Sequence, residues 1–144
     1  MTNYGPAERV YVELEWYDGP RAGIADINGV PHRFDSLFDE KDDEYLGTFR
    51  IWPIEKAMFD LEIEQWQIFV EWDALYEAGK VDADSHPGRG GRNARWDEIE
   101  VLLKQSRTDV PPGVSHAVAE LINIKRGARY APSGPAYMFK WHIL

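Results

Sequence analysis

Histidine is the side chain that most often moves protons or binds metals near neutral pH, and this chain has four. They lack the His-Glu-x-x-His spacing of a zinc site. The chain has no cysteine, which excludes disulfides, cysteine-ligated metals and a cysteine nucleophile. No serine stands in the Gly-x-Ser-x-Gly turn of a hydrolase. The histidines are His32, His86, His116 and His142. The residue types therefore predict no catalytic residue, no metal site and no cofactor.

A polar pocket is the chemical alternative that the residues leave open. The Asp-Gly-Pro-Arg sequence at 18–21 predicts a turn, and His32 follows on the second strand of a hairpin. His32 is then either a hydrogen-bonded, partly buried strand residue or a general base that Asp18 orients. The corresponding function is a small ligand-binding domain or an enzyme, with its pocket between the first hairpin and the long helix. The lining residues would be Tyr17, Asp18, Arg21 and His32.

Charge is distributed unevenly along the chain. Aspartate and glutamate number 25 against 16 lysines and arginines, which gives a net charge of -9. Such a protein repels nucleic acid and anionic membranes at long range, so we expect neither as a partner. The acids concentrate at 35–44, where Lys41 is the only base. This stretch is either a solvated loop or a surface for a basic protein. Calcium is disfavoured because 39–44 lacks the ligand pattern of an EF-hand.

A second segment carries the opposite charge. Residues 86–92 read His-Pro-Gly-Arg-Gly-Gly-Arg. A histidine among arginines can bind phosphate, but the segment lacks the Gly-Lys-Ser/Thr ending of a P-loop and follows no predicted strand. We therefore expect a flexible connector between two helices.

Alternating apolar residues predict a strand at 10–17. Asn28-Gly29 lies between two further apolar runs and predicts a type I′ hairpin, because both residues tolerate positive φ. Pro31 then needs an edge or a bulge, since it has no N–H to donate. A further strand is expected at 46–52. The hairpin register pairs Ile27 with Val30, Ala25 with His32, and Gly23 with Phe34.

The longest helical pattern runs from 54 to 78 and ends at Gly79. Its apolar residues form two stripes about 150° apart around the helix. We expect one stripe to pack on the sheet and the other to meet a second helix or a partner. Trp66 belongs to the second stripe. It is either covered by a helix at 94–106 or forms part of a dimer or partner interface.

The last third of the chain predicts a third, short helix at 114–124 and then a hairpin. The strands of that hairpin, at 128–130 and 136–144, flank a proline- and glycine-containing turn. The order of strands, helices and strands predicts one α+β domain over residues 1–144. Its mostly antiparallel sheet has about five to six strands, packed against one long and one or two shorter helices. The pattern allows either an open sheet or a small barrel.

The N-terminal part resembles the opening of an uncharacterised bacterial protein family. The resemblance rests on Trp-Tyr-Asp-Gly-Pro-Arg-Ala-Gly-Ile-Ala at 16–25 and on Asn-Gly-Val-Pro-His-Arg-Phe at 28–34. Gln-Trp-Gln-Ile at 65–68 is similar as well. The family has no known activity, so the resemblance implies no catalytic residues. It implies a bacterial or phage origin and a cytoplasmic setting, and the first residues lack a signal-peptide pattern.

The residues favour a non-enzymatic protein-interaction module of inhibitor, immunity or adaptor type. The reasons are the uneven charge, the missing catalytic motif and the six tryptophans, a residue type that dominates binding hot spots. The expected partner is another protein or a second copy of this chain. The predicted interface residues are Asp39, Asp42, Asp43, Glu44 and Trp66.

Overall fold

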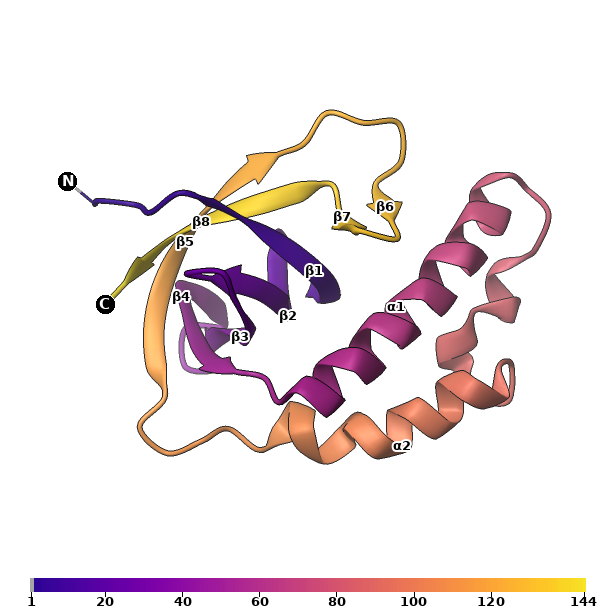
Figure 1. Cartoon of the computed structure of the whole chain (residues 1–144), viewed down its shortest axis with the longest axis horizontal. Coiled ribbons are helices and arrows are strands. Elements are labelled where there is room, and N and C mark those ends of the chain that lie inside the picture. The colour runs from indigo at the N-terminus through magenta and orange to yellow at the C-terminus, as the bar shows by residue number, and fades with distance from the viewer. Residues whose placement is uncertain (1) are drawn as a thin grey trace.

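The protein is an antiparallel β-barrel with a pair of helices on one side (Figure 1). The computed structural model describes residues 2–144. The barrel is closed in the order β1-β2-β3-β4-β5-β8, and every neighbouring pair is antiparallel. The strands are β1 (Ala7–Trp16), β2 (Pro20–Ile27), β3 (Val30–Asp39), β4 (Glu44–Pro53), β5 (Ser115–Asn123) and β8 (Tyr137–Ile143). The predicted α+β class with an antiparallel sheet is confirmed. Because the sheet closes on itself, the fold is a barrel rather than an open sheet.

Two helices are inserted between β4 and β5, joined by a segment with two short 3-10 turns. A two-stranded sheet lies between β5 and β8. These elements are α1 (Lys56–Glu77), η1 (Ala83–Ser85), η2 (Pro87–Arg89), α2 (Ala94–Thr108), β6 (Tyr130–Ala131) and β7 (Gly134–Pro135). Within residues 2–144, neither helix has the length and apolar character needed to cross a membrane.

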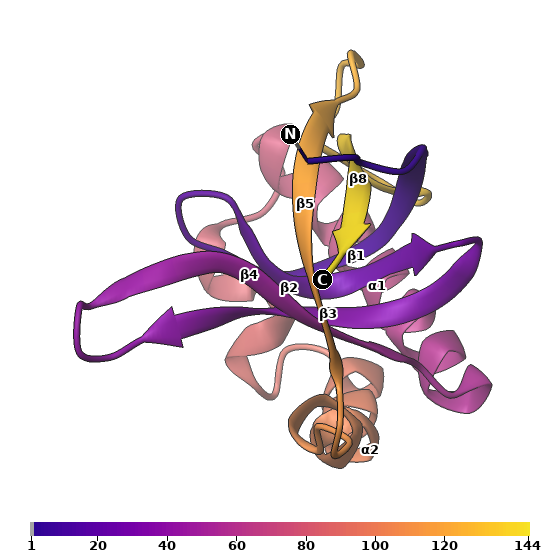
Figure 2. The same ribbon diagram turned by 90° about the vertical axis from the view of Figure 1, so that its left-hand side faces the viewer.

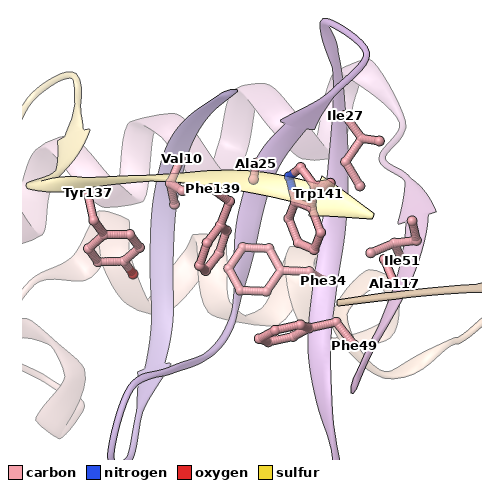
Figure 3. Close-up of a cluster of buried hydrophobic side chains, with 10 residues drawn as sticks. All are labelled: Val10, Ala25, Ile27, Phe34, Phe49, Ile51, Ala117, Tyr137, Phe139 and Trp141. Atoms are coloured by element: carbon pink, nitrogen blue, oxygen red, sulfur yellow. The ribbon is translucent and has the colours of Figure 1, made fainter. Parts of the chain in front are cut away.

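Aromatic side chains fill the barrel (Figure 3). Phe34 is 2% exposed and packs edge to face against Phe49, Phe139 and Trp141, with ring centroids 5.4–5.9 Å apart. Burying each such side chain stabilises the fold by about 1.5–3 kcal/mol. Gly23 makes this packing possible. A Cβ at Gly23 would lie 2.1 Å from the Val12 carbonyl oxygen and 2.9 Å from the Phe34 ring.

The first hairpin has the predicted register. Asn28 and Gly29 adopt φ values of 53° and 75°, as a type I′ turn requires. The Glu8 carboxylate accepts hydrogen bonds from both of their N–H groups at 3.0 and 2.8 Å. The ladder between β3 and β4 begins only at His32, so Pro31 lies at its end, where its missing donor costs little.

Helix α1 lies between the barrel and α2, as its two apolar stripes predict (Figure 1). One stripe packs on Val12 and Ile24 of the barrel wall; it includes Phe59, Ile63, Trp66 and Val70. On the other side Trp72 donates a hydrogen bond to Ser85 at 2.9 Å. Helix α2 packs against α1 and buries Ile99 and Leu103 completely.

The predicted third helix is wrong, because 115–123 is strand β5 between β4 and β8. Its apolar residues fit the period of a helix as well as that of a strand. In the fold, alternate residues such as Ala117 and Leu121 pack on the barrel interior. Without β5, strands β4 and β8 would each have a free edge. Pairing with both of them therefore favours a strand over a helix for this segment.

The predicted C-terminal hairpin is only partly correct. Strand β8 exists with Tyr137, Phe139 and Trp141 facing inward. Its hairpin partner is β5 rather than 128–130, which contributes only to the two-residue strand β6. The loop predicted for the acidic stretch is shorter than expected, since β3 extends to Asp39 and β4 begins at Glu44.

Candidate functional site

The β3–β4 hairpin extends past the barrel as a two-stranded arm (Figure 2). We call residues 39–44, Asp-Glu-Lys-Asp-Asp-Glu, the acidic tip. Asp39 shapes the turn, because its carboxylate accepts hydrogen bonds from the main-chain N–H groups of Lys41 and Asp42. Asp43 has a φ of 52°. The side chains of Asp42, Asp43 and Glu44 are exposed. Four predicted interface residues therefore gather at the end of one hairpin.

An aromatic cluster lies at the base of the acidic tip. Phe38 packs edge to face on Tyr45, with ring centroids 4.9 Å apart, and Tyr17 lies 6.0 Å from the same ring. The Arg21 guanidinium covers Tyr45 at 4.2 Å. Tyr17 is 67% exposed and Phe38 44% exposed. We call the aromatic cluster of Tyr17, Phe38 and Tyr45, together with the acidic tip, the tip surface.

Three of the four residues predicted for a polar pocket join this surface. Arg21 donates hydrogen bonds to the carbonyl oxygens of Tyr17 and Asp18 at 2.7 and 2.9 Å. His32 lies elsewhere. It pairs with Ala25 on β2, whereas Ala22, next to Arg21, pairs with Asp35. That separation along β3 is about 10 Å. The His32 Nδ1 is 2.7 Å from the Val30 carbonyl oxygen, which points to a structural role.

Trp66 is an interior residue. Its side chain is 4% exposed, packs beside Val12 and Val70, and donates a hydrogen bond to the Ala131 carbonyl oxygen at 2.8 Å. The barrel wall and β6 cover it rather than helix α2. Trp66 is thus removed from the surface that the sequence assigned to a partner.

A cleft opens between β1, α1, α2 and the segment that joins the helices. It encloses about 300 Å³, at the low end of the range for small-molecule sites. Aromatic rings form much of its wall, and charged or amide groups form its floor. Its lining comprises Val12, Glu13, Leu14, Glu15, Trp16, Glu62, Gln65, Trp66, Phe69, His86, Trp96, Glu100 and Arg107.

The floor of the cleft is an ion-pair network centred on Glu62. The Glu62 side chain is 1% exposed and accepts hydrogen bonds from Arg33 at 2.6 Å and from Arg107 at 2.6 and 2.9 Å. Arg107 also donates to Gln65 and Glu100. Burial lowers the pKa of the Arg107 guanidinium, but the hydrogen bonds and charges of Glu62 and Glu100 outweigh it and raise that pKa overall. Three separate elements thus hold a fixed, charged floor.

The β1 side of the cleft carries carboxylates whose partners are neutral. Glu13 accepts hydrogen bonds from the hydroxyls of Tyr130 and Tyr137, both at 2.9 Å. Burial raises the pKa of each of these hydroxyls, and the charge of Glu13 raises it further. Glu15 accepts a hydrogen bond from the Tyr45 hydroxyl at 3.2 Å, which links the cleft to the tip surface.

His86 stands among the aromatic rings, 4.6 Å from Trp72 and 6.2 Å from Trp96 between ring centroids. Its Nδ1 accepts a hydrogen bond from the Gly88 N–H at 2.8 Å, which places the proton of the neutral ring on Nε2. Burial and the charge of Arg89 lower the pKa of His86, against a smaller opposing effect of Asp73. The ring is therefore neutral at pH 7 and carries its N–H on Nε2.

The arginines of the glycine-rich segment are bound to acids. Arg92 pairs with Asp84 at 3.1 Å, and Arg95 pairs with Glu64 at 2.8 Å. Arg89 also lies 3.9 Å from the Asp84 carboxylate, so both arginines of the segment that the sequence considered for phosphate are in contact with an acid. Among residues 2–144, no group of three or more metal-ligating side chains is placed to hold a metal ion.

The chain matches no protein-family model, no curated protein and no solved structure. The resemblance of its N-terminal part to a bacterial family stays a prediction.

Sequence reasoning missed the cleft. A usable signal was present in Glu62 and Gln65, which are three residues apart and so lie on one face of α1, close to apolar stripes on both sides. Arg33, flanked by strand residues, was a second signal. Neither signal identifies the partner of the charged residue, because the partners are far apart in the sequence. Arg33 and Arg107, for example, are separated by 74 positions.

Proposed function

We propose that this protein is a non-enzymatic interaction module that binds a basic protein partner through the tip surface. The observation that carries the proposal is the combination of exposed aromatic side chains with a dense row of carboxylates. Tyr17 and Phe38 offer apolar contact area, and the acidic tip carries negative charge at the end of the same hairpin as Phe38. Interfaces of this kind concentrate their binding energy in aromatic anchors, while the charged rim steers the partner.

The contacts along the arm support the same proposal. Phe38 and Tyr45 are directly opposite each other in the hairpin, and Arg21 stacks on Tyr45 from the neighbouring turn. These contacts hold the acidic tip away from the barrel before any partner arrives. A preorganised surface loses less conformational entropy on binding than a flexible loop would.

The test compares two charge-reversal variants in capture from a lysate of the source cells. The tip variant carries Asp42→Lys, Asp43→Lys and Glu44→Lys. The control variant carries Glu71→Lys, Glu77→Lys and Glu120→Lys, three exposed acids on α1 and β5, so both variants change the net charge equally.

We expect a basic protein that wild type and the control variant retain, that the tip variant loses, and whose capture weakens as salt rises. Tyr17→Ala should weaken the purified complex by about tenfold, or 1.4 kcal/mol. Equal capture by both variants, an acidic partner or no specific partner would each contradict the proposal.

One observation favours the second sequence hypothesis, a small ligand-binding domain. A concave site does lie beside the first strand and the long helix, although it is lined by the residues of the cleft rather than by Tyr17, Asp18, Arg21 and His32.

A further inference from the structure

We propose that the cleft between β1, α1 and α2 binds a small organic cation. The proposal is independent of the tip surface and of any protein partner. It rests on three properties of the cleft: aromatic walls, an excess of carboxylates and a stretch of main chain with a free edge.

The walls suit a cation. Trp16, Trp66, Phe69 and Trp96 all line the cleft. The faces of indole and phenyl rings carry negative potential and attract ammonium groups, most strongly where water is excluded. Trp16 already holds one cation of the chain, since the Arg129 guanidinium lies 4.7 Å from its ring.

The charge of the lining is negative. Four carboxylates, from Glu13, Glu15, Glu62 and Glu100, face a single arginine, Arg107. Arginines already neutralise Glu62. Glu13 and Glu15 keep their attraction for a ligand, because their partners are neutral tyrosine hydroxyls, whereas Glu100 shares Arg107 with Glu62.

Glu100 is the carboxylate best placed to meet the ligand. Its side chain is 45% exposed. Within residues 2–144, the donors from Gln65 and Arg107 both reach its Oε1, which leaves Oε2 open. The buried Glu62 and Gln65 hold Arg107 from the other side, each accepting a hydrogen bond at 2.6 Å.

The strand edge adds hydrogen-bonding groups. Strand β8 pairs with β1 only over Ala7–Arg9, whereas β1 from Val12 to Trp16 is paired with β2 alone. The second edge of Val12–Trp16 lines the cleft. A ligand that carries a hydroxyl or carbonyl group beside its cationic centre therefore has main-chain partners in the same site.

The test uses choline as the probe and dimethylbutanol, in which carbon replaces the charged nitrogen, as its neutral analogue. Acetate serves as the anionic probe. The readout is the set of tryptophan indole N–H signals in proton–nitrogen NMR spectra, because Trp66 and Trp96 line the cleft and Trp52 and Trp141 do not.

We expect choline to shift the signals of Trp66 and Trp96 in a saturable way and dimethylbutanol to bind at least about tenfold more weakly. Glu100→Gln should weaken choline binding about three- to tenfold. Glu98 lies on the same helix but pairs with Arg95 outside the cleft, so Glu98→Gln should leave choline binding unchanged. Trp96→Leu should also weaken binding and provides a second variant.

Three outcomes would overturn the inference: no shift with choline, equal binding of the neutral analogue, or binding of acetate in place of choline. The tip variant of Asp42, Asp43 and Glu44 should bind choline like wild type, and Glu100→Gln should retain any protein partner. The two proposals therefore fail separately.

Discussion

Replacing Glu62 by glutamine keeps the volume of the side chain and removes one buried negative charge. In the folded protein that charge faces Arg33, whose side chain is 4% exposed, and Arg107, whose side chain is 19% exposed. The pairs are short, at 2.6 Å each. Glu62→Gln would leave both guanidinium groups in a poorly solvated site with one amide oxygen to share.

Breaking a buried ion pair by removing one partner costs about 3–5 kcal/mol, because the remaining charge stays desolvated. Domains of this size have a free energy of unfolding of about 5–15 kcal/mol. Glu62→Gln should therefore remove a large part of the stability and lower Tm by about 10 °C or more. Urea unfolding followed by tryptophan fluorescence measures the loss, with an unchanged dependence on urea concentration as a check for two-state behaviour.

Glu64→Gln is the matched control, since Glu64 lies on the same helix and pairs with Arg95 at an exposed site. It should cost no more than about 1 kcal/mol. The double change Glu62→Met with Arg33→Met should recover part of the loss, because it removes two buried charges together. If Glu62→Gln and Glu64→Gln lowered the free energy of unfolding equally, the reasoning that burial makes the ion pairs of Glu62 strong would be refuted.

Other predictions follow from single contacts. Gly23→Ala should destabilise the fold by about 3 kcal/mol or more in urea unfolding, since overpacking is costly and here the added methyl group meets rigid backbone. Gly127→Ala, where nothing lies within 4 Å, should stay within about 0.5 kcal/mol of wild type. The lowered pKa of His86 means that the unfolded chain takes up its proton first, so stability should fall as pH drops below the ordinary value of 6.5. In thermal unfolding, Tm of the His86→Asn variant should fall less at acid pH than Tm of wild type. An identical fall would contradict the assignment of this pH dependence to His86. Tyr17→Ala should leave Tm nearly unchanged, because Tyr17 is 67% exposed.

The parts of the fold that follow from neighbouring residues could be predicted. Asn28-Gly29 determines the turn of the first hairpin and hence the pairing of Ala25 with His32. The two stripes of α1 place it between the barrel and α2. Segment 114–124 could not be assigned in this way, since its apolar residues suit a helix or a strand and only the neighbouring β4 and β8 select the strand.

Both candidate sites depend on distant segments meeting in space. The sequence identified the acids of the tip, but Tyr17 and Tyr45 come together only because two hairpins end at the same side of the barrel. The local pattern does not by itself mark Glu62 as a buried residue, whereas in the fold Arg33 and Arg107 enclose it. Periodicity and turn chemistry act over a few residues and determine elements and register. Burial, ion pairing and the shape of the cleft depend on how those elements pack, so the tertiary structure decides them.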